Sequence, residues 1–140
     1  MKDFFRIDIY RQNIFVVVGE NSEDFTKFVN EKFGHKHTKG ENLIDISLTD
    51  FSACCMSATD KKDGTRFNTL VFEELEVDIG TVVHECSHLV DNICENISMP
   101  LTEDTTEPRA YLMEKVVEEV IVLLRKHKDM ACKKRKPKKK

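Results

Sequence analysis

The residues best suited to chemistry in this sequence are two histidines and a glutamate in the stretch Thr81–Asp91, T-V-V-H-E-C-S-H-L-V-D. On a helix, residues four apart lie on one face, about 6 Å apart at Cβ, so His84 and His88 can bind one metal ion together. Zinc accepts imidazole nitrogens at about 2.0–2.1 Å, and a catalytic zinc keeps three protein ligands and an open water position. Glu85 follows the first histidine, a position that suits a general base acting on the bound water.

The alternative interpretation of this motif is a solvated helix face that carries two histidines and a glutamate. Two observations argue against it. The flanking residues, among them Val82, Leu89 and Val90, predict a mostly buried helix, in which an unpaired polar group is costly. A third ligand also follows, because Glu107 lies nineteen residues after His88, where a turn and an antiparallel helix can return it to the metal. Pro108 would then be the first helical residue, where its missing N–H costs nothing.

Two further residues are candidates for supporting roles at such a site. Asp91 lies three residues after His88 and could accept the second N–H of a metal-bound imidazole, which fixes the tautomer. The alternative for Asp91 is a solvated position near the helix end. Tyr111 lies one turn after Glu107, and its hydroxyl could stabilise the oxyanion of a tetrahedral intermediate. More often, such a tyrosine packs its ring and forms a local hydrogen bond.

These motifs resemble a family of zinc enzymes. An H-E-x-x-H followed by a downstream helical Glu resembles the gluzincin arrangement of zinc metallopeptidases, and Glu107–Leu112 resembles the E-x-x-A-Y-L of small phage- and prophage-encoded metallopeptidases. The resemblance covers roughly residues 4–124, and its matching positions are His84, Glu85, His88 and Glu107. It implies a minimal zincin-like fold, a Zn²⁺ cofactor and a peptide or protein substrate. The chain lacks the third His and the Met-turn of metzincins and the substrate-binding domains of large gluzincins. Phage-associated peptidases that cleave repressors are a further possibility, although the downstream Glu helix departs from their pattern.

The spacing of apolar residues predicts an α+β fold. Residues 4–10 alternate between apolar and polar and residues 14–18 are an apolar strand, which together predict a first hairpin. Residues 51–59 and 66–72 flank a turn signal and predict a second. Ser22 is a candidate N-cap for a helix that ends near Gly34, and Asp78 for the H-E-x-x-H helix. We therefore expect a small antiparallel or mixed sheet of two hairpins, packed on the N-terminal helix, the H-E-x-x-H helix and a helix over residues 107–124. Residues 42–48 are expected to form a loop or short strand.

The strand before the H-E-x-x-H helix is a candidate for aligning the substrate. In peptidases of the resembled type this strand commonly lies at a sheet edge, where an extended peptide can pair with it. By that analogy Arg66, Asn68 and Leu70 are substrate-binding candidates. The alternative is an ordinary core strand.

Composition indicates one domain and an intracellular location. At 140 residues the chain fits a single domain, which we place at residues 1–130. No apolar run approaches the ~20 residues that span a bilayer, and the N-terminus has no signal-peptide core. The five cysteines are an odd number without C-x-x-C spacing, which suits a reducing compartment. We therefore expect a cytoplasmic protein, in the host cytoplasm if it is phage-encoded.

The charge is distributed unevenly along the chain. Residues 125–140 carry ten Lys and Arg and one Asp, a net of +9, which leaves twelve basic and twenty-four acidic residues, a net of −12, in residues 1–124. We expect residues 131–140 to be a disordered tail, because like charges at this density repel one another. Its residues Lys133, Lys134, Arg135 and Lys136 could neutralise nucleic-acid phosphates. The alternative is a solubilising tail, or one that binds the protein's own acidic body.

The sequence thus predicts a zinc-dependent peptide hydrolase. The alternative is a non-catalytic, zinc-stabilised module that binds nucleic acid, or a virion or host protein, through its tail. His35 and His37 could form a second metal site, but an exposed loop is favoured because no further ligands lie nearby in sequence. No pattern indicates sequence-specific recognition of nucleic acid or contact with a membrane.

Overall fold

The computed structural model describes residues 1–33, 52–59 and 66–135. Within them the chain forms four strands, β1 (Lys2–Ile7), β2 (Gln12–Val18), β3 (Ala53–Thr59) and β4 (Arg66–Phe72), and three α-helices, α1 (Ser22–Phe33), α2 (Ile79–Asn96) and α3 (Thr106–Arg135). Short 3-10 turns, η1 (Asp8–Tyr10) and η2 (Glu103–Thr105), precede β2 and α3. The expected α+β class is confirmed. Predictions for Gly34, His35, His37, residues 42–48, the turn at 60–64 and Lys136 lie outside the described residues.

The sheet has the strand order β1-β2-β4-β3. The antiparallel pairs β1–β2 and β3–β4 confirm both predicted hairpins. The two hairpins join through β2 and β4, which run parallel with Phe15 opposite Thr69. A parallel connection needs a crossover, and α1 lies in the segment between β2 and β4. The first strand ends earlier than predicted, because Asp8–Tyr10 turn as η1 and Arg11 closes the turn at φ 51°.

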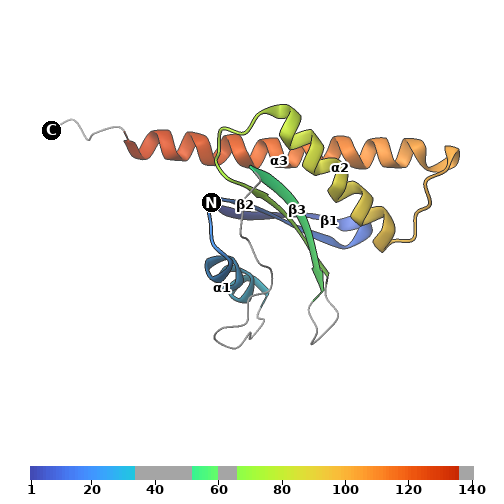
Figure 1. The fold of residues 1–140 in the computed structure, drawn as a ribbon, viewed down its shortest axis with the longest axis horizontal. Helices are drawn as coiled ribbons and strands as arrows, with labels where there is room; N and C mark the ends of the chain where they lie inside the picture. The colour runs from blue at the N-terminus through green and yellow to red at the C-terminus, as the bar shows by residue number, and fades with distance from the viewer. Residues whose placement is uncertain (34–51, 60–65, 136–140) are drawn as a thin grey trace.

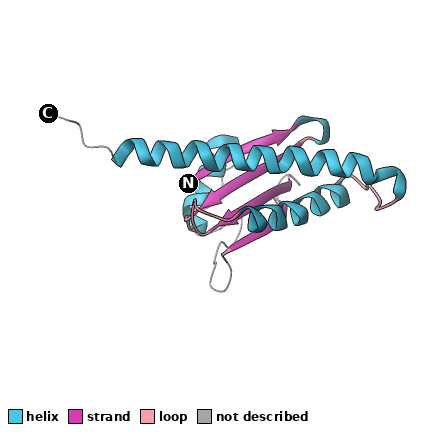
Figure 2. Ribbon diagram, turned by 90° about the horizontal axis from the view of Figure 1, so that it is seen from above, coloured by secondary structure: helices cyan, strands magenta, loops and turns pink. Residues whose placement is uncertain are grey.

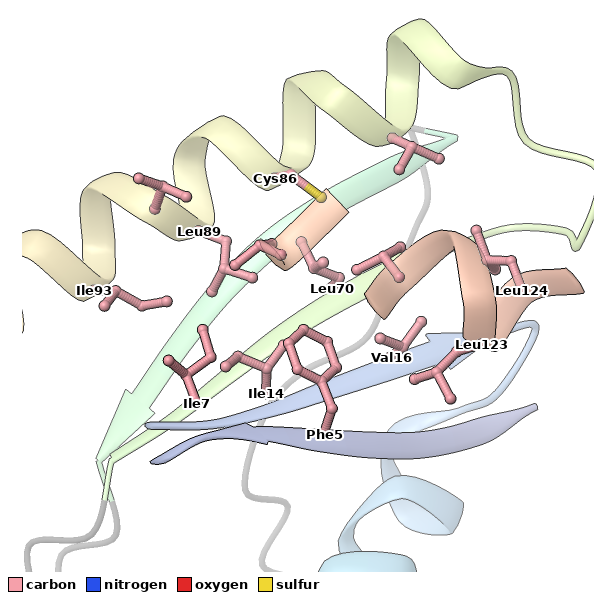
Figure 3. Close-up of a cluster of buried hydrophobic side chains, with 14 of the residues drawn as sticks. Phe5, Ile7, Ile14, Val16, Leu70, Cys86, Leu89, Ile93, Leu123 and Leu124 are labelled. Atoms are coloured by element: carbon pink, nitrogen blue, oxygen red, sulfur yellow. The ribbon is translucent and has the colours of Figure 1, made fainter. Parts of the chain in front are cut away.

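The helices lie on both faces of the sheet. Figure 1 shows α1 below the strands and α2 with α3 above them, and Figure 2 shows α2 and α3 lying across that upper face. The lower layer buries Phe25 and Val29 of α1 against alternate sheet residues such as Phe15 and Val17. The upper core is larger and is drawn in Figure 3; its labelled members are Phe5, Ile7, Ile14, Val16, Leu70, Cys86, Leu89, Ile93, Leu123 and Leu124. This core fixes which face of α2 points inward.

Side chains cap the starts of α1 and α2. The side chain of Asp78 accepts a hydrogen bond from the Thr81 backbone N–H at 2.9 Å, which confirms it as the N-cap of α2. At α1 the prediction is shifted by one residue. The Asn21 side chain accepts from the Asp24 backbone N–H at 2.9 Å, so Asn21 caps this helix instead of Ser22.

Helix α3 is longer than the predicted helix over residues 107–124 and continues to Arg135. Residues 131–135, expected to begin a disordered tail, instead form its last turns. None of the helices in the described part of the chain combines the length and the apolar character that crossing a membrane requires.

Candidate metal centre

The two histidines of the motif lie together on the outer face of α2. Val82, Cys86, Leu89 and Ile93 of this helix are buried against the sheet, which leaves His84 and His88 exposed. Their Nε2 atoms are 3.2 Å apart, and their rings are nearly perpendicular, with an interplanar angle of 86°. The prediction that the two imidazoles share one face is therefore confirmed.

The separation of the two Nε2 atoms is compatible with both binding one zinc ion. If each Nε2 bound one zinc at about 2.0–2.1 Å, the 3.2 Å separation would correspond to an N–Zn–N angle of about 100°, near the tetrahedral value. The pair would therefore need little rearrangement to bind a metal. Without a metal, the same distance allows one imidazole N–H to donate to the other ring, with the tautomers deciding the direction.

The predicted third ligand does not join the histidines. Within residues 1–33, 52–59 and 66–135, no three His, Cys, Asp or Glu side chains form a group that could hold a metal ion. Glu107 is exposed near the start of α3. Glu107 lies apart from the histidines because of how α3 is rotated about its own axis. Arg109 contacts α2, and two residues along a helix correspond to about 200° of rotation, which directs Glu107 away from α2.

Asp91 and Tyr111 also have surroundings that the sequence did not reveal. The Asp91 carboxylate accepts a hydrogen bond from the Arg109 guanidinium and forms an ion pair with it, linking α2 to the start of α3. The pKa of Arg109 is raised, and the largest contribution comes from this hydrogen bond. Tyr111 is 68% exposed, one turn beyond Glu107 on the same side of α3. Within the described residues, neither side chain forms a hydrogen bond with His84 or His88.

Glu85 occupies a more enclosed position than the histidines. It is 8% exposed and helps to line a hollow of about 580 Å³ with His84, Thr81, Ser52 and Ala53. This hollow lies where α2 packs against the start of β3. A buried carboxylate is costly unless polar groups or water solvate it, so its position beside a polar hollow is consistent with a functional group.

Burial, together with the negative charge of Glu85, raises the pKa values of nearby thiols. Burial raises the pKa of Cys55 to about 12, and the negative charge of Glu85 contributes to that shift. Burial likewise raises the pKa of Cys86 to about 12, with smaller contributions from Cys55 and Glu85. Asn92 of α2 donates to the Cys55 sulfur at 3.6 Å. Both thiols are therefore neutral near pH 7, and they pack in the core between α2 and the sheet.

The predicted substrate edge is wrong. β4 is an inner strand that pairs with β2 on one side and β3 on the other, so it has no free edge. Asn68 and Leu70 are fully buried, and Arg66 donates a hydrogen bond to the Asn96 side chain at the end of α2. The apolar run Leu70–Phe72 was the signal for an inner strand, because a strand covered on both faces lacks alternation.

The edge on this side of the sheet belongs to β3 instead. In the described residues β3 pairs only with β4. Its start, with Ser52 and Ala53, borders the hollow that contains Glu85 and His84. The small residues of β3 carry no chemical signal of their own, so its sequence does not indicate this position beside the hollow.

Ion pairs connect the C-terminal part of α3 to acidic side chains of β1 and of the segment before α2. Asp3 of β1 accepts from the Lys126 ammonium at 3.0 Å and contacts the His127 imidazole at 3.0 Å. Lys128 pairs with Glu76 at 2.9 Å. Lys133, a predicted nucleic-acid contact, is exposed on the last turns of the helix, and Lys134 and Arg135 lie on the same helical segment.

Comparisons with known proteins leave the site to be interpreted from its geometry. No family model, curated protein or solved structure matches this chain.

Proposed function

We propose that this protein is a zinc-dependent peptide hydrolase of the zincin type. The observation that supports it best is the His84–His88 pair, with its 3.2 Å Nε2 separation, beside a hollow lined by the carboxylate of Glu85. In that proposal the two imidazoles hold Zn²⁺, which when bound supplies Lewis acidity toward a carbonyl and lowers the pKa of water.

Glu85 is the proposed general base. Its carboxylate would take a proton from the attacking water and later return it to the leaving amine. Glu85 is mostly buried but lines the hollow, so water can reach its carboxylate from that side. The edge of β3 is the proposed site where an extended substrate pairs with the sheet, because it borders the same hollow.

Glu107 is the proposed third metal ligand, and this part of the proposal requires a rearrangement. The first turn of α3 would have to rotate toward α2, which would break the contact between Arg109 and Asp91. Asp91 would then be released to accept an N–H from a histidine. Tyr111 would move with the same turn, and its proposed role as an oxyanion donor depends on that movement.

A second candidate function is a non-catalytic zinc-binding module that contacts nucleic acid or a protein through its basic end. The observation that favours it is the lack of a third donor beside the histidine pair among the described residues. The exposed Lys133 on a helical extension supplies the cationic surface that phosphates require.

The substitution Glu85→Gln distinguishes the two functions. The proposal expects wild-type protein to bind one zinc per chain and to cleave unfolded polypeptide, measured with quenched fluorescent peptides and zinc competition by a chromogenic chelator. Glu85→Gln should retain the zinc and lose cleavage, whereas the matched control Glu95→Gln, on the exposed side of α2, should keep both. Equal cleavage by wild type and Glu85→Gln would refute the role of this base. Zinc binding without cleavage under any condition would favour the module.

A further inference from the structure

A second hollow also borders the first turn of α2, and it is lined by different residues from the hollow beside the histidines. It has a volume of about 350 Å³ and lies between the segment after β4, the start of α2 and the middle of α3. Six aliphatic residues line it: Leu75, Val77, Ile79, Val82, Ile121 and Leu124. This volume and lining are typical of sites that bind small ligands.

Part of this apolar lining is in contact with water. Val82 and Leu124 are buried, but Ile79 is 60% exposed. Leu75 and Val77 are half-buried, whereas the acidic residues between and beside them, Glu74, Glu76 and Asp78, are exposed. An apolar ligand in the hollow would remove this surface from water.

The charges at the rim of the hollow leave one cation unmatched. Glu76 and Lys128 both line it and neutralise each other in an ion pair at 2.9 Å. Arg125 also lines it and has no hydrogen-bond or ion-pair partner among the residues that the structure describes. Of the nearby acids, Asp78 accepts hydrogen bonds from Thr81 and does not line this hollow. An anionic group is therefore favoured at Arg125, away from Glu76.

We propose that this hollow binds an aliphatic carboxylate, with its chain among the six aliphatic residues and its carboxylate on the guanidinium of Arg125. A guanidinium matches a carboxylate with two parallel N–H···O bonds, and the apolar lining matches an unbranched or branched alkyl chain. The same chemistry occurs in a free fatty acid and in a peptide that ends in leucine. Six of the nine lining residues are aliphatic, which favours the free acid, because its chain carries no backbone amides that need hydrogen-bonding partners.

The chain length of the ligand provides the first test. Calorimetric titration of the full-length protein with hexanoate, octanoate and decanoate should give one site per chain. Affinity should rise about fourfold for each added methylene until the hollow is filled. Decanol should bind about tenfold or more weakly than decanoate, because it lacks the charge that Arg125 pairs with.

Variants of the rim provide the second test. Arg125→Gln should weaken decanoate about tenfold or more and leave decanol unchanged, while Arg6→Gln, an exposed arginine on β1, is the matched control and should bind normally. Glu76→Gln should bind decanoate at least as well as wild type. Ile79→Asp, at an exposed position that tolerates polarity, should abolish binding while retaining the circular dichroism of the folded protein.

The proposal would be overturned by an absence of decanoate binding below its micelle concentration, by equal affinity in Arg125→Gln, or by affinity that does not depend on chain length. Binding of only a leucine-terminated peptide would overturn the ligand class. Hydrogen exchange adds a readout independent of zinc, because decanoate should slow the exchange of backbone N–H groups around Val82 in wild type and not in Ile79→Asp.

Discussion

The substitution His88→Ala gives the sharpest test of the metal centre, read out as zinc-dependent thermal stability. The folded chain holds two imidazole Nε2 atoms 3.2 Å apart, whereas the unfolded chain does not hold them together. A metal that needs an N–M–N angle of about 100° therefore binds the native state preferentially. Binding to the native state alone raises the free energy of unfolding by linkage.

The expected size of this effect follows from the linkage relation. At free zinc 100-fold above the dissociation constant, the native state gains about 2.7 kcal/mol. For a chain of 140 residues, each kcal/mol corresponds to about 3–4 °C in melting temperature, so zinc should raise it by about 8–11 °C. His88→Ala removes one of the two ligands and should abolish the shift. Because His88 is exposed, the variant without zinc should melt close to wild type.

The assay is differential scanning fluorimetry across a zinc series, with a chelator-treated reference for each variant. Glu95→Ala, an exposed residue further along α2, is the matched control and should show the full shift. Glu107→Gln then tests the third ligand separately: a reduced shift would support its movement to the metal, and a full shift would exclude it. A zinc shift in His88→Ala as large as in wild type would refute the paired-histidine site itself.

Three other predictions concern the body of the fold. Partial burial acts to raise the pKa of Asp3, but hydrogen bonds from a His and a Lys of α3 lower it overall. Asp3→Asn should therefore reduce the melting temperature at pH 7. The difference in melting temperature between wild type and this variant should shrink as the pH falls below 3.8. Leu89→Ala, at a fully buried position, should lower the free energy of unfolding by about 2–5 kcal/mol in urea titrations; a loss below 1 kcal/mol would contradict the packing in Figure 3. The pKa values of Cys55 and Cys86 are raised to about 12, so both thiols should resist iodoacetamide at pH 8 in the folded protein. The exposed Cys132 should react, and mass spectrometry would show the difference. Rapid labelling of all three would contradict the burial of Cys55 and Cys86.

The elements of the fold could be predicted because their signals are local. Alternation in residues 4–10, the apolar strand 14–18 and the turn signal between residues 51–59 and 66–72 predicted both hairpins. The spacing of Val82, Leu89 and Val90 predicted a mostly buried α2. The predicted ends of elements were less accurate. Asn21 and Ser22 are both good N-caps by residue type, and only the structure shows that the Asn21 side chain accepts from the Asp24 N–H. The length of α3 was underestimated because its contacts with Asp3 and Glu76, distant in sequence, favour an ordered helix over a charged tail.

The sequence alone determined that His84 and His88 face the same way, because four residues make about one helical turn and the apolar residues of α2 fix which side is outward. The tertiary structure decided that Glu85 is largely buried, where α2 packs against the start of β3. Only the tertiary structure decided that β3, and not β4, forms the edge near this helix, because strand order depends on how two hairpins join. The tertiary structure also decided that Arg109 contacts α2 while Glu107 turns away from it, because the rotation of α3 is set by packing along its whole length.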